Sequence, residues 1–312
     1  MPFEVEEVHR WGQSTGKDKM IVETFIVGKD NKNDYHQKLK MSIYYSDALI
    51  RRPLSKGFLF EEQIVIALWN VLPKKGTFID VGANVGTIVV PIAKHVEKCI
   101  AFEPQRFVRK LLKKNIRDNN IKNIKVIKGA AGHYNGRAEL DKNIVDHNGV
   151  VQELEYSGTK KINYGGVKVG VGGPKIKIFK IDSMKIKKLI GMKVDVEGHE
   201  PAVFYGARKT IKRYRPIIAF ENNFQKIDPD TENLKALKLT DKILNFDIVN
   251  YAETLGYNCI LEIMLDNYML CPTELPITTD NNFKFYPVNN FANNRFSYSK
   301  LKKFKLKKII WN

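Results

Sequence analysis

An apolar stretch that ends in an acidic residue and runs into a glycine-bounded turn constrains the fold of this chain more than any other feature. Residues 78–86 read Phe-Ile-Asp-Val-Gly-Ala-Asn-Val-Gly, which predicts a buried strand followed by a tight turn that opens a helix. Gly82 and Gly86 allow the backbone to turn sharply and to approach a ligand without an obstructing Cβ. The segment therefore predicts a nucleotide-type crevice in an α/β fold.

The surrounding segments alternate between strand and helix patterns. Strands are predicted over residues 77–81 and 98–102, and helices over residues 87–95 and 106–119. Because strand-helix-strand repeats build parallel sheets covered by helices, this alternation predicts a parallel sheet. A glycine-rich region over about 136–180, with apolar residues at every second position, interrupts the pattern and predicts antiparallel hairpins.

The remaining segments define an expected domain organisation. Residues 1–55 are predicted to form a β-rich amino-terminal cap, residues 56–275 the main α/β domain with the hairpin insertion, and residues 276–312 a basic carboxyl-terminal extension. Within the main domain, parallel strands resume at 191–196. One long helix is expected over about 233–256, before two closing strands.

The acid at the strand end narrows the choice of cofactor. The spacing differs from the Gly-x-Gly-x-x-Gly of dinucleotide enzymes, and Asp80 stands where a pyrophosphate would approach the helix start. A carboxylate there repels NAD and ATP but attracts S-adenosylmethionine, which carries a sulfonium and an ammonium and no phosphate. Glu103, in Ala-Phe-Glu-Pro at the end of the next predicted strand, is placed to accept both ribose hydroxyls. We therefore predict S-adenosylmethionine; the alternative is an unrelated α/β protein with a fortuitous acidic strand end.

A second cluster of ionisable residues lies at another predicted strand end. Residues 193–200 read Lys-Val-Asp-Val-Glu-Gly-His-Glu, at the sheet edge where open α/β folds bind ligands. A structural interpretation has Glu200 capping the next helix and Lys193 neutralising Asp195. That interpretation explains the whole cluster less well than a functional site does.

The order of these motifs resembles the FkbM methyltransferase family over about residues 60–225. The similarity is carried by FIDVGANVG, AFEP, Ile-Asp-Ser-Met at 181–184, KVDVEGHE, Gly-Ala at 206–207 and Arg-Pro-Ile-Ile-Ala-Phe-Glu at 215–221. The resemblance implies a doubly wound, mostly parallel, seven-stranded Rossmann-like sheet. It also implies methyl transfer from S-adenosylmethionine to a hydroxyl, commonly of a sugar, a lipid-linked glycan or a polyketide.

The resemblance also implies roles for individual residues. By position, the cofactor would be held by Asp80, Gly82, Asn84, Gly86 and Glu103, with Asp195 facing the methyl-donor end.

Deprotonation of the acceptor hydroxyl needs a base within hydrogen-bond reach, and the candidates are His199, Asp195 and Glu197, with Glu221 closing the rim. His199 is favoured because an unperturbed histidine titrates near neutral pH. The same carboxylates could hold Mg²⁺, but we do not favour this and predict no metal site.

The net charge of +18 adds alternatives for the partner. A basic field concentrates anionic partners. A lysine-rich solvated surface would have the same excess of positive charge without any such partner. RNA ribose 2′-O-methylation is therefore the second candidate, and a non-catalytic basic scaffold with the same fold is the third. No apolar run long enough to span a membrane and no secretory signal pattern occurs in these residues, so we expect a cytoplasmic protein.

Overall fold

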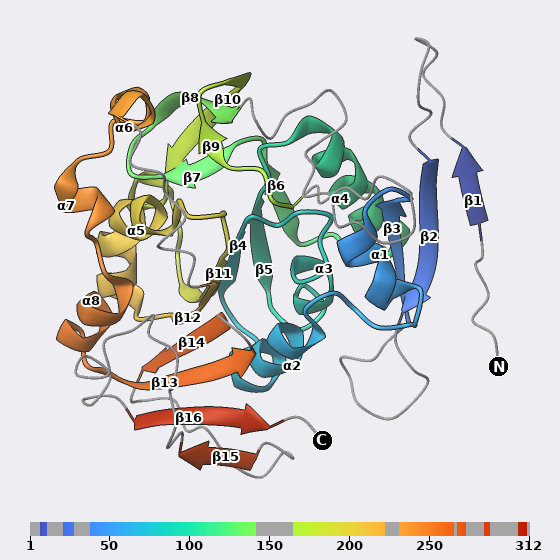
Figure 1. Cartoon of the computed structure of the whole chain (residues 1–312). Helices are drawn as coiled ribbons and strands as arrows, with labels where there is room; N and C mark the ends of the chain where they lie inside the picture. Colours follow the sequence, from blue (N-terminus) through green and yellow to red (C-terminus); the bar gives the residue numbers. More distant parts are fainter. Residues whose placement is uncertain are drawn as a thin grey trace.

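A mixed sheet of nine strands forms the centre of the computed structural model, which describes residues 7–10, 21–27, 38–141, 165–221, 231–264, 267–272, 284–287 and 305–310 (Figure 1). The strands are parallel across one half and mixed in direction across the other. In order, they are β15 (Lys284–Pro287), β16 (Lys305–Ile310), β13 (Tyr257–Met264), β14 (Asn267–Pro272), β12 (Ile217–Glu221), β11 (Leu189–Val194), β4 (Thr77–Val81), β5 (Lys98–Phe102) and β6 (Ile124–Ile127).

The α/β class is confirmed, but the expected seven-stranded, mostly parallel sheet is not. Strands β12, β11, β4, β5 and β6 are parallel, whereas β14 is antiparallel to both of its neighbours. Two further strands, β15 and β16, extend the sheet beyond β13. They come from the expected basic extension, where the alternation of lysine with apolar residues at 303–307 is itself a strand pattern that the sequence reasoning did not use.

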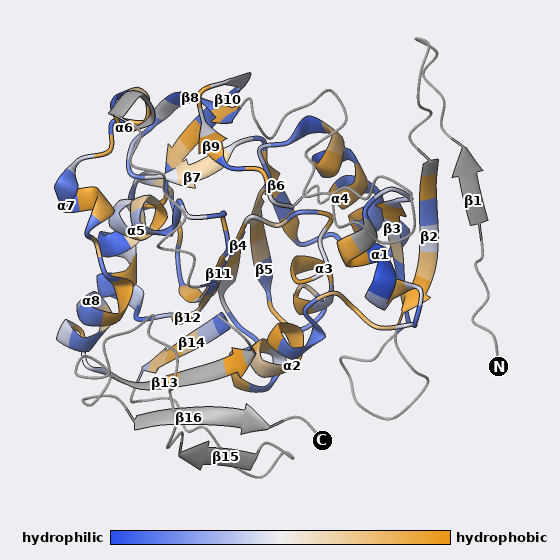
Figure 2. Cartoon of the chain, viewed as in Figure 1, coloured by the Kyte–Doolittle hydropathy of each residue, from blue (hydrophilic) through white to orange (hydrophobic). Residues whose placement is uncertain are grey.

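Two hydrophobic clusters lie on opposite faces of the sheet, because successive strand residues point to opposite sides. Phe78 packs with residues of α2 (Glu62–Val71), α3 (Val89–Ile92) and α4 (Arg106–Asp118). Ile79 packs with residues of α5 (Glu200–Tyr214) and α8 (Ile248–Thr254). Figure 2 shows the apolar strands β4, β5 and β11 enclosed between these helices. None of the helices that the structure describes is long and apolar enough to cross a membrane.

The long helix expected over 233–256 is wrong, since three short helices occupy that segment. They are α6 (Thr231–Ala236), α7 (Asp241–Leu244) and α8. Lys238 adopts a left-handed conformation with φ 54°, which ends the first helical segment. Asp247 begins α8 by accepting hydrogen bonds from the N–H groups of Val249 (2.9 Å) and Asn250 (3.1 Å).

Two smaller sheets flank the main one. The first is β1 (Glu7–Arg10), β2 (Ile21–Val27) and β3 (Leu39–Tyr44), next to α1 (Ala48–Leu54). The second has the order β7 (Ala130–Gly132), β10 (Gly172–Lys180), β8 (Gly136–Asp141) and β9 (Val169–Gly170). The antiparallel pairing of β8 with β10 is the pattern predicted for this region, although residues 142–164 lie outside the described residues. The proposed domain boundaries stay predictions.

One buried asparagine joins the first small sheet to the glycine-bounded turn. The side chain of Asn115, on α4, accepts a hydrogen bond from the N–H of Ser42 (2.7 Å) and donates to the carbonyls of Ser42 (3.0 Å) and Val85 (2.8 Å). Because the amide is fully buried, these bonds are strongly favoured. The turn at residues 82–86 is thereby fixed to the surrounding structure.

Candidate active site

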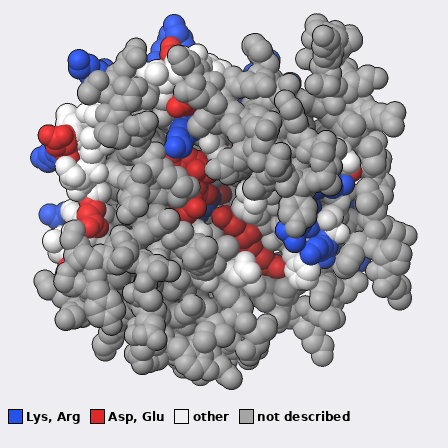
Figure 3. Space-filling view, viewed as in Figure 1, with Lys and Arg blue, Asp and Glu red and all other residues white. Residues whose placement is uncertain are grey.

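A pocket lies at the carboxyl ends of β4, β5, β11 and β12, the edge at which open α/β sheets bind ligands. Figure 3 shows acidic side chains gathered at the centre of this face of a strongly basic protein. The predicted residues that line the pocket are Gly82, Asn84, Glu103, Asp195, Glu197, His199 and Glu221. Asp80 and Gly86 are not among the lining residues.

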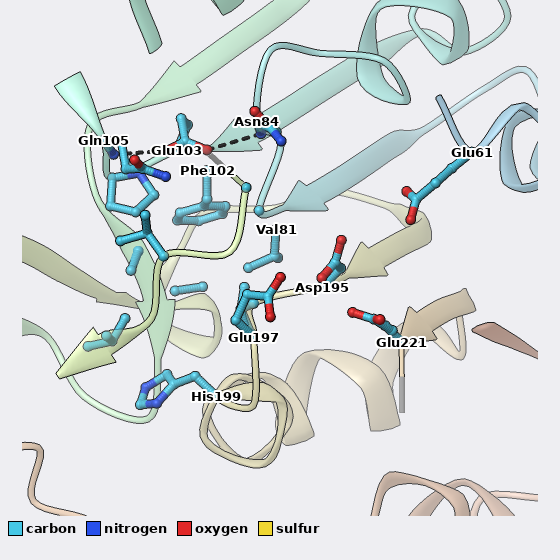
Figure 4. Close-up of a pocket in the computed structure, with 18 of the residues that line it drawn as sticks. Glu61, Val81, Asn84, Phe102, Glu103, Gln105, Asp195, Glu197, His199 and Glu221 are labelled. Atoms are coloured by element: carbon cyan, nitrogen blue, oxygen red, sulfur yellow. Dashed lines mark hydrogen bonds between the residues drawn. The ribbon is translucent and has the colours of Figure 1, made fainter. Parts of the chain in front are cut away.

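Glu103 is held by backbone donors on both sides. Its Oε2 accepts a hydrogen bond from the N–H of Asn84 (3.0 Å) and its Oε1 accepts one from the N–H of Gln105 (2.8 Å), as Figure 4 shows. Asn84 directs its N–H to this carboxylate from a left-handed conformation, φ 49°. Burial raises the pKa of Glu103 to about 7, although these two bonds and the charge of Arg109 oppose the shift. The carboxylate is therefore preorientated at the end of β5.

The two glycines of the turn are required by the packing of the chain itself. Both have positive φ, 82° at Gly82 and 98° at Gly86. A Cβ on Gly82 would lie 1.9 Å from the carbonyl oxygen of Asp195, and one on Gly86 would lie 2.8 Å from Cδ1 of Leu112. Gly82 therefore allows the two loops of the pocket to touch, and Gly86 allows α4 to pack under the turn.

Asp80 is fully buried behind the pocket instead of at its surface. Among the described residues neither carboxylate oxygen makes a hydrogen bond of normal geometry, although the backbone of Val89 is close enough to favour the charged form. Burial raises the pKa of Asp80 to about 6, while the positive charge of Lys193 opposes this shift. Asp80 therefore acts on the pocket through its field and not by contact.

Lys193 links the loop that follows β4 to the loop that follows β11. Its Nζ donates hydrogen bonds to Oδ2 of Asp195 (2.9 Å) and to the carbonyl of Gly82 (3.3 Å), and the residue is only 4% exposed. Burial opposes its charged form, but the carboxylates of Asp195, Asp80 and Glu61 outweigh this effect and raise the pKa of Lys193. The ammonium stays charged and fixes Asp195 in position.

The loop after β11 is shaped by a buried carboxylate. Oε1 of Glu200 accepts hydrogen bonds from the N–H groups of Val196 and Gly198, both at 3.1 Å. Both donors precede α5, so Glu200 holds the loop after β11 and does not cap the helix as the structural interpretation expected. Burial raises its pKa to about 7. Glu197 and Gly198 both have positive φ, 55° and 97°, and the turn that they form places the Glu197 side chain on the pocket wall.

Three carboxylates gather at this end of the pocket. Oxygens of Asp195, Glu197 and Glu221 lie within 4.8 Å of one another, a spacing at which they could share a cation. Glu221 is the last residue of β12, so each group comes from a strand end or the loop that follows one. Exposed acidic groups also cluster without a metal, and the spacing alone does not identify a ligand.

His199 lies apart from these carboxylates in Figure 4. It is 5% exposed, and its Nε2 has no hydrogen-bond partner among the described residues. Burial, and to a lesser extent the charge of His133, lower the pKa of His199 to about 4. The ring is therefore neutral at pH 7, and the ordinary histidine pKa on which its sequence-based role rested does not hold here.

Sequence reasoning missed Glu61 and the apolar wall of the pocket. Glu61 lines the pocket from the residue before α2, in a left-handed conformation with φ 57°. In the sequence, Phe60, Ile64 and Leu68 have the apolar spacing of a helix, and this pattern places Glu61 inside the helix instead of before it. The apolar wall includes Val167 and Val169, which come from the hairpin region and follow no recognisable site motif.

Comparison with known proteins gives one family and a set of distant structures. Residues 80–258 match the methyltransferase FkbM domain, which is more than half of the chain. None of the curated proteins compared with the chain matches it.

Among solved structures, the methyltransferase FkbM from Methylobacillus flagellatus is 18% identical with a TM-score of 0.38, covering 63% of this chain and 43% of that protein. The chain thus spans less than half the length of that relative. The tRNA (uracil-54, C5)-methyltransferase from Pyrococcus abyssi, in complex with S-adenosyl-L-homocysteine, is 12% identical with a TM-score of 0.32, covering 58% of this chain and 31% of that one. An rRNA methylase from Streptococcus thermophilus is 13% identical with a TM-score of 0.32, covering 72% and 96%. These TM-scores are too low to carry an argument about function.

Proposed function

The chain belongs to the FkbM methyltransferase family, and we propose that it transfers a methyl group from S-adenosylmethionine to a hydroxyl of a sugar or glycan. The observation that carries this proposal is the division of one pocket into an apolar end and an acidic end. Phe102 and Pro104 flank Glu103 at the first end, and Asp195, Glu197 and Glu221 line the second. S-adenosylmethionine has the same division, with a neutral adenosine at one end and, at the other, a methionine moiety whose sulfonium and ammonium outweigh its one carboxylate in charge.

The adenosine half fits the surroundings of Glu103. A preorientated carboxylate at this strand end is suited to accept both ribose hydroxyls, and its two backbone donors leave further lone pairs for that purpose. Next to it, an apolar surface suited to a planar base is lined by Phe102, Pro104, Ala130, Ala131, Val167 and Val169.

The cationic half fits the carboxylates around Asp195. A sulfonium is stabilised by negative charge in a partly buried site, where the attraction is screened less than in water. Lys193 fixes one oxygen of Asp195, so this carboxylate needs little reorganisation when a cation arrives. NAD and ATP would bring phosphates to the same negative field, which disfavours them.

Methyl transfer is an in-line displacement at carbon, so the chain must align the acceptor oxygen with the methyl-sulfur bond and accept a proton. The carboxylates of Asp195, Glu197 and Glu221 are close enough together for one to orient the hydroxyl and another to take its proton. His199 is the fourth candidate, although a pKa of about 4 makes it a weak base. If His199 takes the proton, His199→Ala abolishes turnover at every pH; intact turnover assigns the proton to the carboxylates.

A polyol is the acceptor class that suits this end of the pocket. Ionised carboxylates only accept hydrogen bonds, and sugar hydroxyls supply several donors. RNA brings phosphates that these carboxylates repel. RNA methylation would therefore require basic residues outside this pocket to bind the RNA backbone. Mg²⁺ bound by the three carboxylates is not favoured, since nothing besides their spacing supports it.

A transfer assay with radiolabelled S-adenosylmethionine across glycans, nucleotide sugars and short RNAs tests the proposal. We expect label in a hydroxyl-bearing glycan or sugar, and retention of activity after exhaustive chelation. Label in RNA, with steep salt dependence, would instead support ribose methylation. A chain that neither transfers label nor binds the cofactor would be a scaffold.

A further inference from the structure

Glu61 lines the pocket although both its backbone conformation and the charges around its carboxylate are unfavourable for the stability of the folded chain. Its φ and ψ, 57° and 36°, are left-handed, a region that disfavours residues with a Cβ. Although it is the residue that begins α2, its side chain makes no capping hydrogen bond with that helix. Local structure therefore gives no reason for glutamate at this position.

The charges around Glu61 make its carboxylate less stable still. Burial raises its pKa to about 7; Lys193 opposes the shift, whereas Asp195, Asp80 and Glu197 add to it. The ammonium of Lys193 donates its hydrogen bonds to Asp195 and to the carbonyl of Gly82 instead of to Glu61. A carboxylate held among other carboxylates, in a backbone conformation that glycine would adopt more easily, is typical of a residue kept for a ligand.

The position of Glu61 identifies which part of the cofactor it meets. Figure 4 shows Glu61 and Glu103 on opposite sides of the pocket, with Asp195 between them. In S-adenosylmethionine the sulfonium is bonded to the ribose methylene, and the α-ammonium lies at the far end of the methionine chain. With the ribose at Glu103, the sulfonium would come near Asp195 and the ammonium near Glu61.

We propose that Glu61 binds the α-ammonium of S-adenosylmethionine, and that the segment before α2 is thereby part of the cofactor site. This inference rests on the proposed function, because it takes the cofactor as given. It adds a ligand residue outside residues 80–258, the part of the chain that matches the family. The same contact would form with S-adenosylhomocysteine, which keeps the ammonium and lacks the sulfonium charge.

Titration calorimetry of both ligands against the wild-type chain and Glu61→Gln tests this role. We expect the Kd for each ligand to rise by about tenfold to a hundredfold, because one charge-assisted hydrogen bond is lost. The factor should be the same for both ligands. The thermal midpoint of the unliganded variant should equal or exceed that of the wild type. Glu97→Gln, which removes an exposed charge, should change neither quantity.

A second variant separates binding from backbone strain. Glu61→Gly should raise the thermal midpoint and weaken both ligands, whereas Lys238→Gly relieves a left-handed residue (φ 54°) away from the pocket and should leave affinity unchanged. Unchanged affinity in both Glu61 variants would overturn the inference. So would a loss confined to S-adenosylmethionine, or a midpoint that falls with affinity. Failure of the wild-type chain to bind either ligand would instead overturn the proposed function.

Discussion

Replacing Lys193 by methionine should destabilise the protein in a pH-dependent way. Methionine keeps the length and the apolar stem of the side chain and removes the ammonium that bonds Asp195 and the carbonyl of Gly82. Removing one partner of a fully buried pair costs about 3–5 kcal/mol. Because the Asp195 side chain is 22% exposed, solvent screens part of this loss, and about 2–3 kcal/mol is expected from this pair.

Asp80 supplies the pH dependence. Its pKa in the folded chain, about 6, already lies above its ordinary value of 3.8, and loss of the nearby ammonium raises it further. At pH 5, Asp80 is mostly protonated in the folded protein with or without Lys193. The free-energy cost of burying Asp80 is therefore nearly the same in the wild type and in the variant. Above the folded pKa, the penalty grows by about 1.4 kcal/mol for every further tenfold increase in the proton affinity of this carboxylate. Lys193→Met should therefore cost more free energy of unfolding at pH 8 than at pH 5.

Urea denaturation at both pH values measures the effect, and Lys187→Met, at an exposed position, is the control. We expect a lower urea midpoint with an unchanged slope, a thermal midpoint lower by roughly 4–12 °C at pH 8, and little change in the control. An equal loss at both pH values would show that Asp80 does not sense Lys193. No loss at either would refute the buried charge cluster.

Three further predictions concern the turn, the carboxylates and the ribose ligand. Gly82→Ala should lower the free energy of unfolding by about 2 kcal/mol or more in urea denaturation, because its Cβ would lie 1.9 Å from the Asp195 carbonyl at a positive φ; a neutral result would contradict the close approach of the loops. The pKa values of Asp80, Glu103 and Glu200 are raised by folding, so the folded state binds more protons and the free energy of unfolding of the unliganded chain should fall as pH rises from about 4 to 7, which denaturation at stepped pH measures. Glu103→Gln should raise the Kd for S-adenosylmethionine about tenfold in calorimetry, and an unchanged Kd would place the ribose elsewhere.

Sequence alone placed a site residue correctly where its own strand sets its position, and not where contacts with distant parts of the chain do. Glu103 and Asp195 follow strands whose apolar patterns are unambiguous, so sequence alone places them at the same sheet edge. Every residue of β4 is buried, and Asp80 lies in register with Lys193 of β11. Its distance from the pocket surface depends on that register, which sequence does not reveal. The low pKa of His199, about 4, comes from burial beside β7, a tertiary contact.

The parts of the fold that sequence reasoning missed were set by tertiary contacts and local caps. The long helix expected over 233–256 failed because apolar periodicity continues across the breaks at Lys238 and Asp247, whose capping geometry overrides it. The strand β16 pairs with β13, a partner over forty residues earlier that no local pattern indicates. Glu61 was missed because a left-handed residue before a helix has no signature when it is not glycine.

Titration calorimetry of the wild-type chain tests most directly whether the acidic pocket holds S-adenosylmethionine. We expect saturable binding of S-adenosylmethionine and S-adenosylhomocysteine at one site, with no comparable heat from NAD or ATP. Because ligation favours the ionised form of Glu103, whose pKa is about 7, binding at pH 7 should release protons to the buffer. Binding of a phosphate-bearing nucleotide in place of S-adenosylmethionine would contradict this assignment of the pocket.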